Sequence, residues 1–360
     1  MAITAAMVKE LREMTGAGMM DCKKALTETN GDMDAAVDVL RKSGAAKMEK
    51  KASRIAAEGI ARVATNGTDA VVAEVNSETD FVAKNEVFQE FVQTVADTAL
   101  ASGLNGGANG EDVDAVLATN GLQELLVEKT ATIGEKLSFR RFAKVSGDCV
   151  ATYLHAGGKI GVLVAATGAN GDAEQEALVN VAMQVAAMNP QYVGRADISQ
   201  AEIDKMRDIT VDSSLNDSAS LPKPILNALF DKAVSDKLFT EEDLAAYEEK
   251  KNDKYLFNFL SDAAKATLAD LAMQDKANIV ENKIFGGMIE GRISKQLKEI
   301  SLLDQVYVKA EDGKQTVGKY LESVNKALTI TKFVRFEVGE GMEKKNEDFA
   351  AEVAAQMSGN

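Results

Sequence analysis

Residues 58–80 read EGIARVATNGTDAVVAEVNSETD, and this stretch decides the fold that we expect. Apolar residues run on both sides of Asn66 and Gly67, a pair that favours the tight turn between two antiparallel strands. Apolar residues then recur at helical spacing between 88 and 95. The sequence therefore predicts a β-hairpin followed by a helix that packs on it.

Asp80 and Phe81 lie side by side where the hairpin ends and the helix begins. Phe81 falls near the helical face of Phe88, Val92 and Val95, so spacing alone leaves a buried core ring and an exposed contact equally open. Asp80 is suited to cap the following helix, because Asp is favoured at that position. From the pattern alone, both a structural role and a binding role remain for this pair.

A similar arrangement recurs further along the chain. Residues 147–168 again predict a strand, a glycine turn and a strand, and residues 174–190 again predict a helix. A constant shift places Val71 on Val162. We interpret the two segments as related α+β halves, which suggests an internal duplication.

Residues 1–53 predict a compact unit of three short helices. Val8, Leu11 and Met14 form an apolar stripe, and a pair of glycines interrupts the helix after them. Such a unit buries only a small core, which is typical of a recognition module attached to something larger. The stretch KMEKKASR, residues 47–54, reads either as a linker or as a local basic patch on an acidic chain.

Residues 201–300 are mostly helical in pattern and rich in charge. Two rough apolar stripes run through 244–271 and 289–300, and long antiparallel helices that project from the body would explain them. The chain returns to strand character at FVRFEVGEG, residues 333–341, and an amphipathic helix is predicted for 343–360.

Together these segments predict an α+β fold with several domains. The predicted domains are a three-helix domain at 1–53, a core N-subdomain at 54–145, a core C-subdomain at 146–200 and 301–342, a helical hairpin with an insertion at 201–300, and a C-terminal helix at 343–360.

The composition fits a globular protein. The chain has 360 residues, a formal net charge of -15 and 46% hydrophobic residues. Cys22 and Cys149 are far apart and have no metal-ligand spacing, so a reduced, cytoplasmic setting fits them. No stretch approaches the roughly 20 apolar residues of a membrane span, and the acidic balance argues against direct nucleic-acid binding.

The motifs that carry catalysis are missing from the sequence. There is no G-x-x-x-x-G-K-[ST] phosphate loop, no G-x-G-x-x-G turn, no HExxH and no G-x-S-x-G. His155, the single imidazole, precedes a glycine turn and is more typical of a surface or interface residue than of a general base. We therefore expect no catalytic residue, no cofactor and no metal site, and a protein that is not an enzyme.

Two motifs together carry a close resemblance to a known family. TGAGMMDCKKAL at 15–26 and TDFVAKN at 79–85 are similar to segments of bacterial elongation factor Ts, the guanine nucleotide exchange factor for the GTPase elongation factor Tu. Later stretches that resemble the same family are HAGGKIGVLVA, EGRISKQLKEISLLDQ and FVRFEVGEG. The resemblance covers about 1–210 and 285–360, and the chain between these parts is longer than is typical of the family.

The resemblance implies both a fold and a partner. The implied fold has an N-terminal ubiquitin-associated-like domain of three helices, a core of two related α+β subdomains, a protruding coiled-coil hairpin and a C-terminal helix. The implied partner is elongation factor Tu, in its GDP-bound and nucleotide-free forms. The factor would promote GDP release and allow GTP to rebind.

The resemblance also implies which residues contact the partner. Thr79, Asp80, Phe81 and Val82 would push in near the partner's Mg²⁺, with the ring as a wedge and the carboxylate disturbing the local charge balance. The other contacts that it implies are Met19, Met20 and Lys23 in the first domain, and His155, Gly157 and Gly158 in the second half of the core.

Other interpretations of these features stay open at this point. TGAGMM also fits a plain joint between two helices, and Met19 and Met20 also fit as core filler. The chain also fits a structural scaffold whose helical arm forms a homodimer, or an enzyme with an unrecognised site.

Overall fold

The computed structural model describes residues 3–168, 171–253 and 255–343. The chain divides into two compact units. The first unit comprises Met1–Asn189 and Tyr307–Asn360, and the second comprises Pro190–Val306.

The predicted hairpin forms one side of a four-stranded sheet in the first unit. Strands β1 (Glu58–Thr65) and β2 (Asp69–Ser77) pair antiparallel, and the Asn66 side-chain oxygen accepts hydrogen bonds from the next backbone amides across the turn. Gly67 has a φ of 101°, a value that glycine adopts readily. Strands β4 (Ser138–Ser146) and β3 (Gly106–Gly107) complete the order β1-β2-β4-β3. We did not predict β4.

A second sheet has a similar plan. Strands β5 (Cys149–His155) and β6 (Ile160–Thr167) form a hairpin, and β7 (Thr329–Glu337) pairs antiparallel with β6. In both sheets a hairpin is followed by a long helix, and a strand from later in the chain joins the second strand of the hairpin. The fold is therefore mixed, with helices and two antiparallel sheets, as an α+β class requires.

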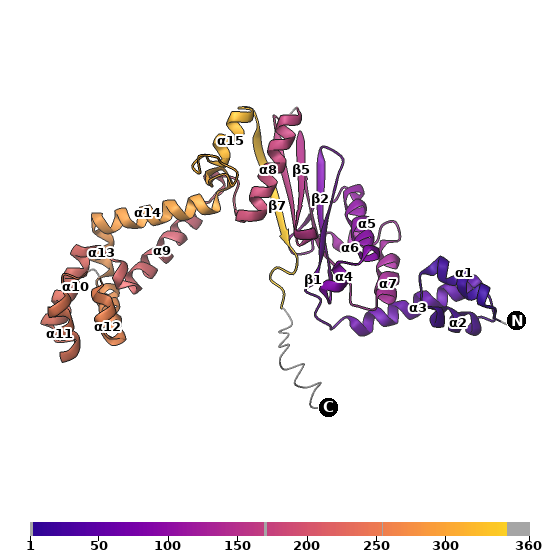
Figure 1. The fold of residues 1–360 in the computed structure, drawn as a ribbon, viewed down its shortest axis with the longest axis horizontal. Coiled ribbons are helices and arrows are strands. Elements are labelled where there is room, and N and C mark those ends of the chain that lie inside the picture. Colours follow the sequence, from indigo (N-terminus) through magenta and orange to yellow (C-terminus); the bar gives the residue numbers. More distant parts are fainter. Residues whose placement is uncertain (1–2, 169–170, 254, 344–360) are drawn as a thin grey trace. The chain divides into compact units, whose positions relative to one another are not determined.

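The two sheets pack face to face between helices (Figure 1). Helix α5 (Glu86–Ser102) covers the outer face of the first sheet, and α8 (Asp172–Met188) covers the outer face of the second. Alternate residues of β2 point to opposite sides, so Val71 packs towards α5 while Val72 packs between the sheets. Helices α6 (Val113–Leu117) and α7 (Leu122–Ile133) add to the first outer layer, and α15 (Val317–Val324) packs on α8.

A buried ion network lies among the strands. Glu74 on β2 is fully buried and accepts hydrogen bonds from Arg140 Nη1 at 2.9 Å and from Arg141 Nε at 2.5 Å. The same carboxylate accepts the backbone N–H of Gly339 at 2.9 Å, just beyond the end of β7. Because a buried charge is costly unless it is paired, this network fixes how β2, β4 and the chain after β7 fit together.

The N-terminal part forms three helices with a small core of their own. Their bounds are α1 (Ala5–Thr15), α2 (Met19–Glu28) and α3 (Met33–Lys51). Val8, Leu11 and Cys22 are buried there, whereas Met14, the third residue of the predicted apolar stripe, is exposed.

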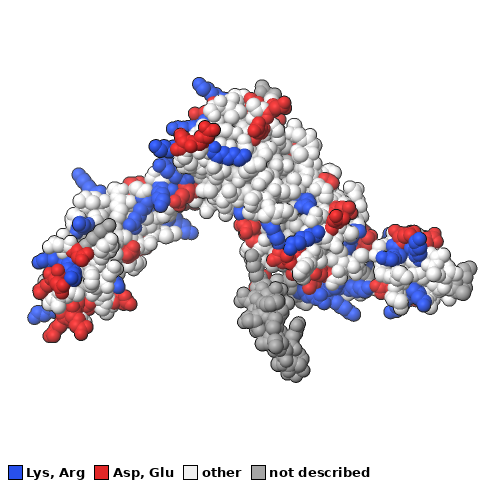
Figure 2. All heavy atoms as spheres, viewed as in Figure 1, with Lys and Arg blue, Asp and Glu red and all other residues white. Residues whose placement is uncertain are grey.

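The basic stretch at 47–54 is not a linker over most of its length, because α3 continues to Lys51. Figure 2 shows basic side chains gathered along this part of α3. Lys47 pairs with Asp21 at 2.8 Å, and Lys51 Nζ donates to the carbonyl of Thr130 on α7 at 3.3 Å. Burial lowers the pKa of Lys51.

In the second unit, the apolar stripe expected at 289–300 lies on one long helix, whereas the stripe expected at 244–271 does not. The described residues of this unit form six α-helices, which are α9 (Gln200–Asn216), α10 (Lys223–Ser235), α11 (Glu241–Lys250), α12 (Asp262–Gln274), α13 (Lys276–Glu281) and α14 (Lys283–Ile300). They share one apolar core, in which the buried Phe230 ring stacks on the partly buried Tyr247 with 4.5 Å between ring centroids. The apolar residues between 244 and 271 thus belong to several short helices, and Phe259 among them is exposed.

At the C-terminal side, the strand expected within 333–341 is present as part of β7. The helix expected at 343–360 lies outside the described residues, apart from its first position.

Candidate partner-binding site

The segment TDFV forms a short projecting turn at the end of β2. Thr79 is the N-cap of α4 (Asp80–Ala83), and its hydroxyl accepts from the backbone N–H of Val82 at 3.4 Å. Thr79, not Asp80, caps this helix, so the capping role considered for Asp80 is wrong. We call residues 79–82 the tip.

Phe81 is the exposed apex of the tip. The residue is 79% exposed, so the interpretation of Phe81 as a core residue is wrong. Val82 is partly buried against the core beneath it, and Ala83 is buried. The tip is therefore anchored on one side while it presents an aromatic ring to solvent on the other.

Asp80 is ionised and carries a local cationic partner. Lys84 Nζ donates to its carboxylate at 2.7 Å and lies 5.9 Å from the centroid of the Phe81 ring. The hydrogen bond from Lys84 is the main cause that lowers the pKa of Asp80, and the positive charge of Lys159 adds to it. At neutral pH the tip thus presents a carboxylate beside an exposed ring.

The turn between β5 and β6 lies at the same end of the sheets as the tip. His155 and Gly157 are exposed, and the Tyr153 hydroxyl lies 3.1 Å from His155 Nδ1. Lys159 at the end of this turn forms an ion pair with Glu58 at the start of β1. Because β1 begins opposite the end of β2, this ion pair brings the turn near the strand end that carries the tip.

Gly158 is buried in this turn, unlike its neighbours. Its φ is 98°, and a Cβ there would lie 2.8 Å from the carbonyl oxygen of Ala61 and 2.7 Å from Arg62 Nη1. Only glycine fits this conformation and this close approach to β1 without strain. Gly158 therefore determines the shape of the turn and presents no exposed surface of its own.

The predicted contacts in the first three helices are exposed. Met19 and Met20 begin α2, with 59% and 75% of their side chains exposed, and Lys23 one turn further is also exposed. The interpretation of the two methionines as core filler is therefore wrong. The joint itself follows the sequence, since Gly16 ends α1 in the left-handed conformation and α2 begins at Met19.

The family model for Elongation factor TS matches residues 78–340, which is more than half of the chain. The chain belongs to the elongation factor TS family. Membership of this family implies a nucleotide-exchange role in translation elongation. The tip and the turn that contains His155 both lie inside the matched range, whereas the first three helices precede it.

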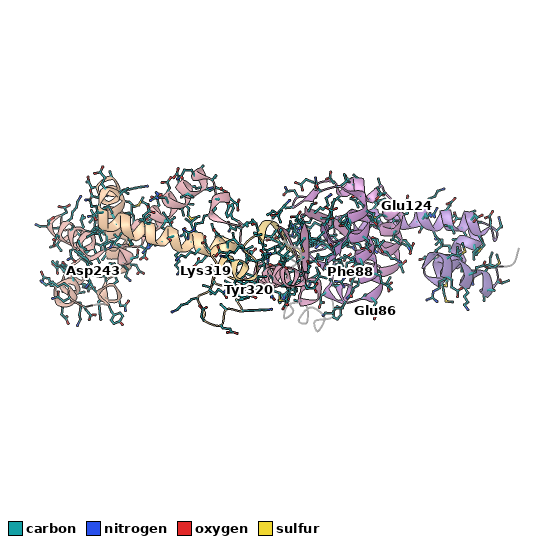
Figure 3. The ribbon with its side chains drawn as sticks, turned by 90° about the horizontal axis from the view of Figure 1, so that it is seen from above. Glu86, Phe88, Glu124, Asp243, Lys319 and Tyr320 are labelled. Carbon is teal, nitrogen blue, oxygen red and sulfur yellow. The ribbon has the colours of Figure 1, made fainter. Side chains whose placement is uncertain are left out.

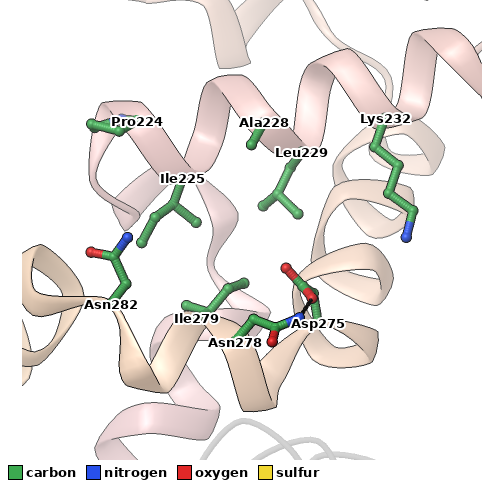
Figure 4. Close-up of a pocket in the computed structure, with 9 residues that line it drawn as sticks. All are labelled: Pro224, Ile225, Ala228, Leu229, Lys232, Asp275, Asn278, Ile279 and Asn282. Atoms are coloured by element: carbon green, nitrogen blue, oxygen red, sulfur yellow. Dashed lines mark hydrogen bonds between the residues drawn. The ribbon is translucent and has the colours of Figure 1, made fainter.

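This elongation factor TS chain also has a groove in its second unit (Figure 4). It has a volume of about 250 Å³ and lies between α10 and α13. The side-chain amides that line it already form hydrogen bonds within the protein. The Asn278 amide nitrogen donates to the Asp275 carboxylate at 2.6 Å, and the side-chain oxygen of Asn282 caps α14. We assign no ligand to this groove.

Neither a metal cluster nor a membrane-spanning helix is found among the residues that the structure describes. No group of three or more His, Cys, Asp or Glu side chains there could hold a metal ion. Over the same residues, no helix combines the length and the apolar character that crossing a membrane requires.

The prediction from the sequence did not include two residues that support the site. Glu135 lies under the tip and binds its backbone, and Lys159 joins the two turns and adds positive charge near Asp80. Neither has a signal in the sequence, since acidic and basic residues are abundant and only the folded chain brings these two to the tip.

Proposed function

We propose that this chain is the guanine nucleotide exchange factor of elongation factor Tu. It binds the GDP-bound GTPase in the cytoplasm, promotes GDP release by disturbing the Mg²⁺ and nucleotide site, and holds the nucleotide-free form until GTP rebinds. It acts by binding and makes or breaks no covalent bond. The observation that carries this proposal is the exposed Phe81 ring on an anchored tip within the region that matches the family.

The tip has the properties that such a step needs. Phe81 offers an apolar wedge for a gap between helices of the partner, where burial of the ring favours the complex. Asp80 offers a negative charge that competes for the polar and cationic groups around Mg²⁺. Because Mg²⁺ is often the largest charge that holds a diphosphate, a change in its coordination loosens the nucleotide.

Linkage sets the energetic requirement. A factor that speeds release must bind the nucleotide-free partner more tightly than the loaded one, and the nucleotide then weakens the factor by the same ratio. A thousandfold coupling needs about 4 kcal/mol of contact that exists in only one of the two states. A wedge that fits only the distorted site supplies such contact, whereas uniform contacts over a large surface do not.

The remaining contacts would hold the partner in register. In this proposal Met19, Met20 and Lys23 belong to a ubiquitin-associated-like domain that grips the nucleotide-binding domain of elongation factor Tu. His155 and Gly157 meet another of its domains.

The proposed domains keep the boundaries predicted from the sequence. The first four are the three-helix domain at 1–53, the related core halves at 54–145 and at 146–200 with 301–342, and the helical region at 201–300. We keep the C-terminal helix at 343–360 as part of the proposal.

Release of a fluorescent GDP analogue from elongation factor Tu tests the proposal. The chain should accelerate release, and Asp80→Ala combined with Phe81→Ala should abolish most of the acceleration with the fold intact. Val87→Ala is the matched control, because Val87 is also an exposed apolar residue near the tip but lies on α5. If elongation factor Tu releases GDP as fast with the double variant as with the original protein, the tip is not the exchange element.

A further inference from the structure

A carboxylate from a distant part of the chain lies directly under the tip. Glu135 follows Gly134, which ends α7 in the left-handed conformation. Glu135 Oε2 accepts hydrogen bonds from the backbone N–H groups of Glu78 and Thr79, each at 3.0 Å. Its other oxygen, Oε1, accepts from the Thr79 hydroxyl at 2.6 Å. One side chain thus holds two successive peptide groups and the residue that caps α4.

The contact is reciprocal. Glu78 Oε1 accepts from the backbone N–H of Lys136 at 2.5 Å, so each of the two segments places a carboxylate on the backbone of the other. We call Glu78, Thr79, Glu135 and Lys136 the amide clamp. Hydrogen bonds from N–H groups to carboxylates are stronger than neutral ones, and this clamp contains several of them side by side.

The clamp also reaches the chain that leaves α3. Lys136 Nζ donates to the carbonyls of Ala52 at 2.7 Å and of Arg54 at 2.9 Å, and Arg54 Nη1 lies 3.2 Å from Glu78 Oε1. The segment after the first three helices is therefore tied to the same point as the tip.

The tip needs such support because α4 is a single turn. Its helix has only four residues, Asp80–Ala83, and a helix this short does not hold its shape in water without outside contacts. The exposed ring of Phe81 contributes little burial of its own. The clamp fixes Thr79, and the Thr79 hydroxyl in turn accepts from Val82 N–H, so the conformation of the tip depends on Glu135.

We propose that Glu135 is a positioning residue for nucleotide exchange. It holds the tip in its projecting conformation in the free protein, so that the cost of ordering Asp80 and Phe81 is met before the partner binds. The inference rests on the proposed function, since it assigns Glu135 a part in the step that the tip performs. Glu135 acts through Thr79 and needs no contact with the GTPase.

Tip order is measurable in the free protein, because the chain contains no tryptophan. Phe81→Trp places one indole at the apex, and its fluorescence anisotropy reports local mobility. Glu135→Ala in this background should lower the anisotropy, whereas Glu124→Gln should leave it unchanged. Glu124 is a matched control, since it is an exposed acid on the same helix α7 that leads to Glu135 (Figure 3). Unchanged anisotropy in the Glu135→Ala protein would overturn the inference.

Exchange kinetics give the second readout. In a titration of GDP release, Glu135→Ala should lower the maximal rate about tenfold, as loss of one charge-assisted contact predicts, and the half-saturating concentration should change little. Glu135→Gln should fall between, because an amide oxygen can still accept from Glu78 and Thr79. If saturating Glu135→Ala protein gives the same maximal rate of GDP release as the original protein, the substitution has only reduced the fraction of folded protein. The inference is then wrong.

A parallel measurement separates this inference from the proposed function. If Phe81→Ala slows release while Glu135→Ala does not, the tip is the exchange element and the role of Glu135 is refuted. If elongation factor Tu releases GDP as fast with Phe81→Ala as with the original protein, the tip is not the exchange element, and the part of Glu135 in exchange fails with it. The proposed function itself fails only if the original protein does not accelerate GDP release.

Discussion

Gly158 shows how one residue can shape the site through its backbone alone. The turn between β5 and β6 runs so close to β1 that a Cβ on this residue would meet the carbonyl of Ala61. Gly157, its neighbour, also has a positive φ of 69°, but no heavy atom lies within 4 Å of its Cβ position. A comparison of substitutions at the two glycines therefore distinguishes the cost of a positive φ, which both share, from the cost of a steric clash, which only Gly158 has.

We predict that Gly158→Ala destabilises the protein more than Gly157→Ala does. Both substitutions force a positive φ on an L residue, which costs on the order of 1–2 kcal/mol. Gly158→Ala adds a clash with backbone that cannot move aside, so its total loss should reach about 3 kcal/mol. Urea unfolding followed by circular dichroism measures both free energies, and equal losses would contradict this account.

Phe81 and Phe88 illustrate how far sequence reasoning reached at this scale. Both were placed near one helical face, yet Phe81 is 79% exposed and Phe88 is fully buried on α5. The reason is Asn85, whose side chain caps α5 and starts a new helix, so that the spacing of α5 does not extend back through α4. The motif singled out these residues along the chain, but the break between two helices decided the exposure of Phe81.

At the scale of elements, Asp243 ties two parts of the second unit together. The side chain is buried on α11 and accepts from the backbone N–H and the hydroxyl of Ser261, both at 2.8 Å, and from the Thr240 hydroxyl at 2.7 Å. Ser261 is itself the N-cap of α12. The hydrogen bond from the backbone N–H of Ser261 is the main cause that lowers the pKa of Asp243.

We predict a pH-dependent cost for Asp243→Asn. Because the folded pKa is lower than the unfolded one, the charged carboxylate stabilises the fold above the unfolded pKa of about 3.9, and this stabilisation is lost as the pH falls through the folded value. At pH 7 the variant should lose about 1–3 kcal/mol of unfolding free energy. The gap to the original protein should narrow below about pH 4. A gap that stays constant across this range would show that Asp243 stabilises only by packing.

Strand β4 shows why some elements escaped prediction. The hairpins β1-β2 and β5-β6, helices α5 and α8 and strand β7 all follow apolar patterns that the sequence displays. In β4 the pattern is interrupted by Arg140 and Arg141, and a register shift opposite Glu74 and Val75 breaks the alternation. A buried arginine is favourable only because Glu74 on β2 receives it, and that pairing exists only in the folded sheet.

At the scale of the whole molecule, two compact units predict two separate unfolding events. Each unit has its own apolar cores, and Phe88 and Phe230 are large, buried side chains in the first and second unit respectively. Truncation of a buried phenylalanine costs about 3–5 kcal/mol. Substitution of Phe88 or of Phe230 therefore tests the stability of one unit at a time.

We predict that scanning calorimetry resolves two transitions. Phe230→Ala should lower the transition of the second unit alone, because the variant loses the stack with Tyr247 and the packing around it. Phe88→Ala should lower only the other transition. If both variants shift one common transition by the same amount, the units unfold together and the division into two units has no energetic counterpart.

The central claim is that the tip recognises elongation factor Tu only when the nucleotide site is distorted. The most direct test is to measure, by titration calorimetry, the affinity of the chain for nucleotide-free and for GDP-bound elongation factor Tu. The original protein should bind the nucleotide-free form much more tightly, and Asp80→Ala with Phe81→Ala should reduce that ratio by about tenfold or more, mainly through weaker binding to the nucleotide-free form. An unchanged ratio in the double variant would contradict the account.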